Sequence, residues 1–225
     1  MSPASPTAVE AGRLVLVDEL LFDMDGTLVD SIVAVELMWR DWAIEHDVDL
    51  PDIHAFHGRT ARDLVASFVP ADEVDRAVER LNEIESAWTQ PIPTIAGALE
   101  LLSSLPPDRW AIVTSAAAPV AVARLAAASV PTPEHLVTGS DVSNGKPHPE
   151  PFERGRRRDG TAIAFEDTVA GLRSARGAGC VTVGVAGTTP AEELREHADF
   201  VVPSLEAVTV AEVGESGIRL SIASL

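Results

Sequence analysis

From residue 94 onward, apolar runs of strand length alternate with segments of helical spacing, and this alternation restricts the possible folds most. The pattern predicts strands at 110–113, 135–138, 162–165, 181–185 and 200–202. It predicts helices at 97–105, 120–128, 150–158, 169–178 and 192–197. Strand–helix–strand repeats build parallel sheets that are covered by helices. The sequence therefore predicts an α/β fold with a Rossmann-like doubly wound parallel sheet.

The N-terminal third has a different pattern. Two short strand-like runs, at 14–17 and 19–22, precede a stretch in which apolar residues recur at helical spacing. A Pro-Ile-Pro segment at 91–93 interrupts that stretch. We therefore expect a small helical cap inserted after the first strand of a discontinuous core, with the cap at 31–93 and the core at 13–30 and 94–225. Two terminal features complete this organisation, a β-hairpin over 208–213 and 218–222 and a disordered lead at 1–12.

The charge balance excludes some partners. Asp and Glu total 35 against 17 Lys and Arg, a formal net charge of -18. So acidic a chain does not attract nucleic acid or an anionic membrane by its overall field. No apolar run reaches the ~20 residues of a transmembrane helix, and no secretory signal is evident at the N-terminus. We expect a cytoplasmic monomer, and its single cysteine, Cys180, excludes an intramolecular disulfide.

Polar residues follow the predicted strands at the points where ligands bind in open parallel sheets. They are Asp23 and Asp25, Thr114 and Ser115, and Glu166 and Asp167, and Lys146 in a Gly-Lys-Pro loop is expected to join them in one crevice. Of the 17 basic residues 16 are Arg, so the lone Lys146 is a candidate for a position where Arg does not suffice. Carboxylates this dense repel one another unless a hard cation lies among them, and Mg²⁺ prefers oxygen ligands. We expect Asp23, Asp167 and the Met24 backbone carbonyl to hold it.

The same residues suggest a reaction. A carboxylate such as Asp23 can attack phosphorus and form an aspartyl-phosphate. Asp25 lies two residues further along an extended backbone and so points the same way, where it can protonate the leaving oxygen and then activate water. Ser115 and Lys146 would hold the phosphoryl oxygens, because positioning and charge neutralisation carry most of phosphoryl transfer.

The run 21–28, Leu-Phe-Asp-Met-Asp-Gly-Thr-Leu, closely resembles the first motif of the haloacid dehalogenase superfamily. Segments 145–152 and 165–168 resemble the beta-phosphoglucomutase-like branch, in which a cap follows that motif. Segment 57–60 is similar to the cap loop of glycerol-phosphate and 2-deoxyglucose-6-phosphate phosphatases. The resemblance covers about 14–202 and implies a Mg²⁺-dependent phosphatase acting on a small sugar or polyol phosphate.

The resemblance also implies a role for each matching position. Asp23 would be the nucleophile and Asp25 the acid/base. Metal contacts would come from Asp23, Asp167 and, through water, Asp25, with Glu166 either behind these ligands or capping the following helix. Phosphate and substrate contacts would come from Ser115, Ala116, Arg59 and His57.

Other functions remain open at this point. A phosphoglucomutase would carry a histidine in the first cap helix, where this chain has Val35. A phosphonate hydrolase would need a cap lysine, and a dehalogenase would lack Asp25. A non-catalytic metabolite-binding module is the alternative from a different class. In addition, segment 153–160 is short and arginine-rich, and we interpret Arg154 to Arg158 as a solvated helix face.

Overall fold

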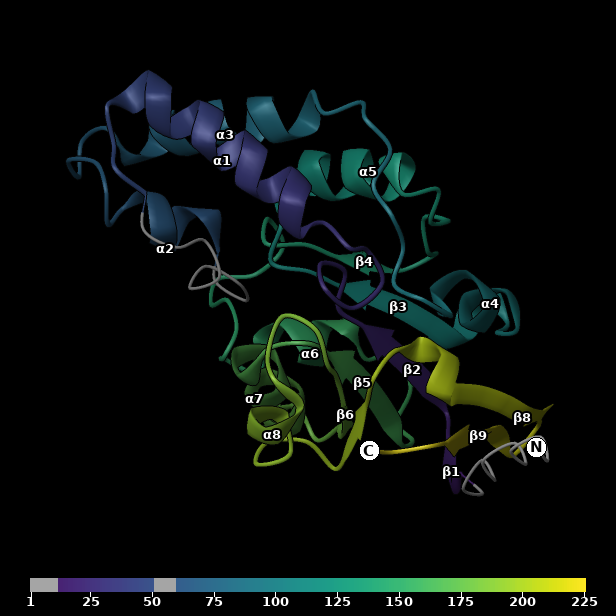
Figure 1. Ribbon diagram of the computed structural model, residues 1–225. Helices are drawn as coiled ribbons and strands as arrows, with labels where there is room; N and C mark the ends of the chain where they lie inside the picture. Colours follow the sequence, from purple (N-terminus) through teal and green to yellow (C-terminus); the bar gives the residue numbers. More distant parts are fainter. Residues whose placement is uncertain (1–11, 51–59) are drawn as a thin grey trace.

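The protein is described by a computed structural model that covers residues 12–50 and 60–225. Its centre is a six-stranded parallel sheet in the order β4-β3-β2-β5-β6-β7 (Figure 1). These strands are β2 (Glu19–Phe22), β3 (Trp110–Val113), β4 (Leu136–Val137), β5 (Ala162–Glu166), β6 (Val181–Val185) and β7 (Phe200–Val202). The chain steps outward from β2 first in one direction and then in the other. This confirms the predicted doubly wound sheet.

Helices cover both faces of this sheet because its strands are apolar on both sides. On β2, Leu20 and Phe22 pack in the core shared with α4 (Ala98–Ser103) and α5 (Ala118–Ala127). Leu21, between them, packs in the opposite core. That second face is covered by α6 (Glu150–Gly155), α7 (Val169–Gly177) and α8 (Ala191–Leu194). In the described part of the chain, no helix is long and apolar enough to span a membrane.

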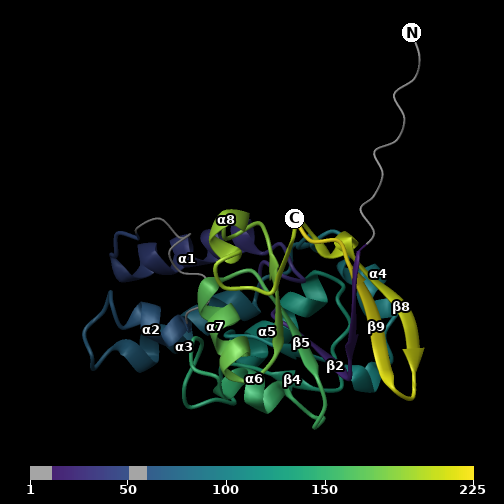
Figure 2. The same ribbon diagram turned by 90° about the horizontal axis from the view of Figure 1, so that it is seen from below.

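A second, antiparallel sheet of three strands lies at one end of the molecule (Figure 2). Its order is β1 (Arg13–Val17), β9 (Gly217–Ile222) and β8 (Val208–Gly214), and β8 and β9 form the predicted hairpin. The first strand-like run therefore pairs with the end of the chain, not with the parallel sheet.

The remaining helices lie at the opposite end of the molecule (Figure 2). They are α1 (Ile32–His46), α2 (Ala61–Val65) and α3 (Val74–Ser86), and they enclose an apolar cluster of their own. Trp42 is fully buried in that cluster, and its indole donates a hydrogen bond to the Ala77 carbonyl at 2.9 Å. The chain enters and leaves this helical group side by side, since Val29 pairs with Thr94. The group also touches the sheet core, where α3 packs against α5.

The arginine-rich segment differs from its predicted form. Helix α6 ends at Gly155, so the prediction of a helix to residue 158 was wrong, although the side chains of Arg154 and Arg157 are exposed as predicted. The buried Glu19 carboxylate accepts the backbone N–H groups of Arg157 and Arg158. Arg156 donates to the carbonyl groups of Ala178 and Gly160. These contacts with distant segments stop the helix, and they explain why local pattern misplaced its end.

Candidate active site

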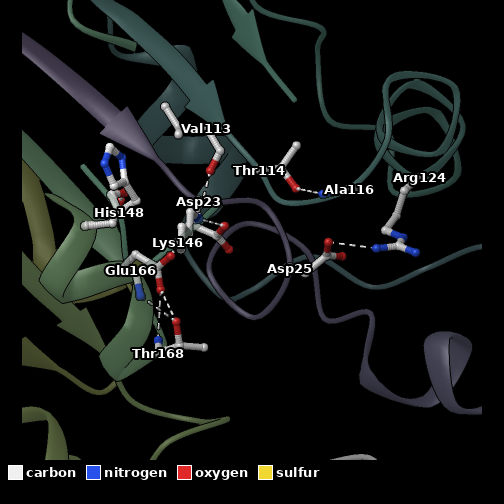
Figure 3. Close-up of polar contacts among 12 residues, drawn as sticks. Asp23, Asp25, Val113, Thr114, Ala116, Arg124, Lys146, His148, Glu166 and Thr168 are labelled. Carbon is white, nitrogen blue, oxygen red and sulfur yellow. Dashed lines mark hydrogen bonds and ion pairs between the residues drawn. The ribbon is translucent and has the colours of Figure 1, made fainter. Parts of the chain in front are cut away.

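Four segments converge at the carboxyl edge of the parallel sheet. Asp23 follows β2, Ser115 follows β3 after one residue, and Asp167 follows β5. Lys146 reaches the same place from the loop before α6 (Figure 3). The sequence prediction that these side chains share one crevice agrees with this arrangement. The pocket lies between this edge and the helical group, and it is lined by Asp23, Asp25, Ser31, Val35, Trp39, Ala61, Leu64, Glu85, Thr114, Ser115, Ala116, Ala117, Arg124, Glu166, Asp167 and Thr168.

Lys146 is the most enclosed charge of the site, with a side chain only 1% exposed. Its Nζ donates to Asp23 Oδ1 at 2.5 Å, to Glu166 Oε1 at 2.7 Å and to the Val113 carbonyl at 3.0 Å. An ammonium has three donors, so these contacts use all of them. Burial lowers the Lys146 pKa, but the charges of Asp23 and Glu166 outweigh it and raise that pKa above its ordinary value. The lysine therefore stays charged and grips the Asp23 carboxylate.

Glu166 fixes the position of Lys146. Its second oxygen, Oε2, accepts the backbone N–H and the hydroxyl of Thr168, each at 2.9 Å. Helix α7 passes this carboxylate so closely that a Cβ at Gly171 would collide with it. Glu166 is thus held by the start of α7 while it binds the lysine. It binds Thr168, the residue that caps α7, and its place behind the metal ligands stays a prediction.

Asp23, Glu166 and Asp167 form an acidic cluster whose carboxylate oxygens lie within 4.8 Å of one another. Both oxygens of Asp167 are buried and, among the described residues, neither accepts a hydrogen bond of good geometry, although the nearby Thr188 hydroxyl acts to lower the Asp167 pKa. Burial, together with the charges of Glu166 and Asp23, raises the Asp167 pKa well above its ordinary value. Buried carboxylates with unused oxygens are the donor set that a hard divalent cation needs. The cluster could therefore bind a divalent metal.

The pKa of Asp23 is raised to about 8. Burial is the largest cause, and the charge of Lys146 only partly offsets it, while Glu166 and Asp25 raise the pKa further. A cation in the cluster would lower this pKa again and keep the carboxylate ionised, as a nucleophile must be.

Gly26 makes room beside the cluster. Its φ is 81°, a left-handed backbone conformation, and a Cβ there would run into the Asp167 carboxylate. The glycine after the second aspartate is therefore required both by the turn and by the close approach of Asp167.

Asp25 does not join this cluster. Its Oδ1 accepts the Ser31 hydroxyl at 2.6 Å, and its Oδ2 accepts Arg124 Nη1 at 2.7 Å (Figure 3). Arg124 also donates from Nη2 to Glu85 Oε1 at 3.0 Å. Burial lowers the Arg124 pKa, but the two carboxylates more than compensate and raise it. Asp25 thus belongs to a second charged group.

Sequence reasoning missed Arg124 and Glu85, although a signal was present. Arg124 is the only charged residue of α5, and it lies between the buried Ala121 and Leu125. Glu85 falls four residues after the buried Leu81, on the apolar side of α3. A charge on an apolar helix face is a candidate for a buried ion pair, and both residues fit that description.

The Met24 carbonyl was predicted to bind metal, and its surroundings contradict that prediction. It accepts the backbone N–H groups of Leu28 and Val29, both at 2.9 Å. A carbonyl oxygen has two lone pairs, and these two hydrogen bonds occupy both. We therefore correct the predicted ligand set by removing Met24.

The predicted phosphate and substrate contacts lie in different places. Ser115 and Ala116 both line the pocket, and the Ala116 N–H donates to the Thr114 hydroxyl at 3.1 Å. His57 and Arg59 lie outside the described residues. From the helical group, four apolar side chains and one carboxylate line the pocket: Val35, Trp39, Ala61, Leu64 and Glu85.

Comparison with known proteins agrees with this geometry. A family model described as haloacid dehalogenase-like hydrolase matches residues 20–185. Hexitol phosphatase A of Escherichia coli is 41% identical over 202 residues, which are 85% of this chain and 93% of that protein. Glycerol-1-phosphate phosphohydrolase 1 of Saccharomyces cerevisiae is 32% identical, covering 87% of this chain and 86% of the relative. The 2-deoxyglucose-6-phosphate phosphatase 1 of the same yeast is 31% identical, with coverages of 91% and 95%.

Solved structures show the same fold. CbbY from Rhodobacter sphaeroides in complex with phosphate has a TM-score of 0.70 at 22% identity, covering 84% of this chain and 95% of that one. A hydrolase from Pseudomonas syringae has a TM-score of 0.69 at 26% identity, with coverages of 82% and 92%.

Proposed function

The chain belongs to the haloacid dehalogenase-like hydrolase family and is a phosphoric monoester hydrolase, and we propose that its substrate is a small sugar or polyol phosphate. One observation carries the mechanism: the buried Asp23 carboxylate lies at a strand end, bound by Lys146 and beside Asp167. The named relatives, a hexitol phosphatase, a glycerol-1-phosphate phosphohydrolase and a 2-deoxyglucose-6-phosphate phosphatase, support the substrate class.

In the proposed reaction Asp23 attacks the phosphorus atom and forms an aspartyl-phosphate. The bond from phosphorus to the ester oxygen breaks, and that oxygen takes a proton from Asp25 and leaves as an alcohol. Asp25, now ionised, removes a proton from water, which attacks the phosphorus. The bond to Asp23 then breaks, releasing inorganic phosphate and restoring both carboxyl groups.

The other residues hold charge in place during these steps. Lys146 keeps the Asp23 carboxylate oriented, and it would reach a phosphoryl oxygen by exchanging one of its three present acceptors. The Ser115 hydroxyl and the Ala116 N–H would bind the other phosphoryl oxygens. The Ala116 N–H would give up its bond to Thr114 for this purpose.

We infer that the acidic cluster takes Mg²⁺, held by Asp23 and Asp167 with Glu166 behind them and Asp25 reaching it only through water. The unpartnered Asp167 oxygens support this assignment. When bound, Mg²⁺ would neutralise the charge that accumulates on the phosphoryl group. Asp167 then has a purely ligating role, since it carries no proton in the proposed steps.

Helices α1, α2 and α3 would act as the cap, residues 31–93, over a core made of 13–30 and 94–225. Their separate apolar cluster and the side-by-side connections at Val29 and Thr94 support a unit that moves as one body. Such a cap would close over small metabolites and exclude water and bulky phosphoproteins. Val35 lies in the pocket where the related mutases carry a histidine, which favours hydrolysis over transfer back to the sugar. The proposal includes a monomer in the cytoplasm, which sedimentation and cell fractionation would check.

Phosphate release from a panel of hexitol, glycerol and deoxysugar phosphates, with p-nitrophenyl phosphate as a general substrate, tests this proposal. We expect turnover of at least one metabolite, complete loss after exhaustive chelation with EDTA, and recovery on adding Mg²⁺. Absence of turnover throughout the panel would favour a binding module. Full activity in EDTA would remove the metal from the mechanism.

A further inference from the structure

Arg124 connects three parts of the molecule that are far apart in sequence. Its guanidinium comes from α5 in the sheet core and binds Asp25 in the loop after β2. It also binds Glu85, which lies near the end of α3 in the helical group. Figure 1 shows α5 next to the ends of α1 and α3, and Figure 3 shows the Asp25 carboxylate turned toward Arg124. The ion pair with Glu85 therefore crosses the contact between the helical group and the core.

This group is buried, unlike an ordinary surface ion pair. The side chains of Arg124 and Glu85 are 6% and 8% exposed, and that of Asp25 is 22% exposed. Removing charges from water is unfavourable, and a well-packed apolar set at such a place is often at least as stable. A guanidinium has a planar fork of donors that can bind two carboxylates at once in a fixed geometry. Stability alone gives no reason for this arrangement, whereas the orientation of Asp25 does.

We propose that Arg124 is a positioning residue for the acid/base Asp25, and that its ion pair with Glu85 makes this positioning depend on α3 being seated against α5. The inference rests on the proposed function, because it assigns how one of its two aspartates is held. Separation of the helical group from the core would remove Glu85 from Arg124 and release one side of the guanidinium. Asp25 would then be held correctly only when the pocket is closed.

The leaving group of the substrate provides a specific test. An alkyl phosphate needs a proton on its departing oxygen, whereas p-nitrophenolate leaves readily without one. A defect in Asp25 positioning should therefore lower kcat/KM, which reports the steps up to departure of the leaving group, far more for glycerol phosphate or hexitol phosphate than for p-nitrophenyl phosphate. The kcat values do not make this distinction, because Asp25 also activates the water that hydrolyses the aspartyl-phosphate formed from either substrate. A general loss of folded enzyme would lower both kcat/KM values equally. The ratio of the two kcat/KM values separates these causes, and Asp25→Asn gives the ratio for an enzyme without its acid.

Arg124→Met should lower kcat/KM for the alkyl phosphate by about 10²-fold and for p-nitrophenyl phosphate by less than about threefold. Arg124→Lys should recover part of the alkyl activity, because it retains a charge that can bind Asp25. The matched control is Arg80→Met. Arg80 also bridges two carboxylates, Glu45 and Glu83, but its side chain is 43% exposed and lies outside the pocket. This control should leave the ratio unchanged.

Removing Arg124 alone leaves Glu85 buried without its ion-pair partner, so we expect Arg124→Met by itself to lower the melting temperature. The double variant Arg124→Met with Glu85→Leu removes both charges and should recover the melting temperature. We expect its ratio of kcat/KM for the alkyl phosphate to kcat/KM for p-nitrophenyl phosphate to remain as low as that of Arg124→Met. Glu85→Leu alone should lower the alkyl rate by a smaller factor, because Arg124 keeps its bond to Asp25 and loses its anchor.

The outcomes are distinguishable. An unmodified enzyme that hydrolyses both substrates, with a ratio that Arg124→Met leaves unmoved, would overturn this inference and leave the proposed function standing. A ratio that responds to Arg124→Met and not to Glu85→Leu would overturn the dependence on α3. Absence of turnover in the unmodified protein would overturn both proposals.

Discussion

Two buried cations form ion pairs with the two aspartates of the Asp23-Met24-Asp25 run, and each cation lies between two carboxylates. Lys146 binds Asp23 and Glu166, and all three belong to the edge of the parallel sheet. Arg124 binds Asp25 and Glu85, and Glu85 comes from the helical group. The first group lies entirely within the sheet core. The second is completed only across the contact between α5 of the core and α3 of the helical group.

The difference matches the demands on the two aspartates. A nucleophile must keep one position throughout the reaction, and Lys146, a compact charge with three donors on three fixed acceptors, provides it. An acid/base must approach the ester oxygen and then a water molecule. It is therefore suited to a partner such as Arg124, whose position depends on whether the helical group is closed over the core. Asp25 is also the more exposed of the two, with 22% of its side chain accessible against 9% for Asp23.

Asp23→Asn is the substitution for which we expect the largest loss of turnover. An amide of the same shape can neither attack phosphorus nor contribute charge to the metal cluster. Turnover should fall by at least about 10³-fold on alkyl and nitrophenyl phosphates alike, whereas Asp25→Asn should largely spare kcat/KM for the nitrophenyl substrate. Steady-state kinetics and a melting curve measure both, with Asp75→Asn, which removes an exposed ion pair with Arg62, as the control. Loss of less than tenfold would contradict covalent catalysis by Asp23.

Replacing the buried lysine with arginine, and the buried arginine with lysine, tests whether the two charged groups need different cations. Lys146→Arg should lower kcat on both substrates by at least about tenfold and up to about 10³-fold. The planar guanidinium is too wide for a site where the lysine side chain is 1% exposed, and it would displace Asp23 or Glu166. Arg124→Lys should have a smaller effect, a fall in kcat/KM for the alkyl phosphate alone. Near-normal kcat for Lys146→Arg would show that any cation suffices there, and the distinction between the two groups would fail.

Gly171→Ala tests the support behind Lys146 with a smaller change. The added methyl group would collide with the Glu166 carboxylate, which must then shift and loosen its bond to the lysine. We expect kcat to fall by about tenfold and the free energy of unfolding to fall by about 1–3 kcal/mol, as in other overpacked sites. Gly187→Ala is the matched control, because a Cβ there would meet open space. Equal effects of the two substitutions would remove Glu166 from the account of the lysine.

The two charged groups also differ in how far the sequence predicts them. Asp23 and Asp167 follow strands that are buried on both faces, and such strands appear in the sequence as continuous apolar runs, whereas Lys146 lies in a loop and was singled out as the lone lysine. The strands at 110–113, 181–185 and 200–202 were accordingly predicted with the bounds that the structure has. Because parallel strands share one carboxyl edge, knowing where they end was enough to bring Asp23 and Asp167 together.

The second group depends on contacts that local pattern does not encode. Arg124 and Glu85 meet because α5 and α3 pack together, and the sequence specifies each helix but not that contact. The same limit explains two other misses. β1 pairs with β9 from the far end of the chain, and the end of α6 is set by Glu19 from a different strand. The Met24 carbonyl was dropped from the ligand set for a local reason, because it accepts hydrogen bonds from two backbone N–H groups within the same turn.

The smallest expected effect concerns the loop that delivers Lys146, and it extends the comparison to a charge at the surface. Glu150, at the start of α6, accepts the backbone N–H groups of Ser143 and Asn144, just before the lysine. The Ser143 N–H and the Asn144 side chain lower the Glu150 pKa from 4.5 to about 2. A carboxylate whose pKa is lower in the folded state stabilises the fold fully above its unfolded pKa and loses that contribution as it is protonated.

The melting temperature of the unmodified protein should therefore exceed that of Glu150→Gln by a constant margin above about pH 4.5, and the margin should shrink as pH falls toward 2. Glu153→Gln, an exposed change on the same helix, provides the control. A margin that stays constant through this range, or none at neutral pH, would show that Glu150 does not hold the loop, and Lys146 would owe its position to Asp23 and Glu166 alone.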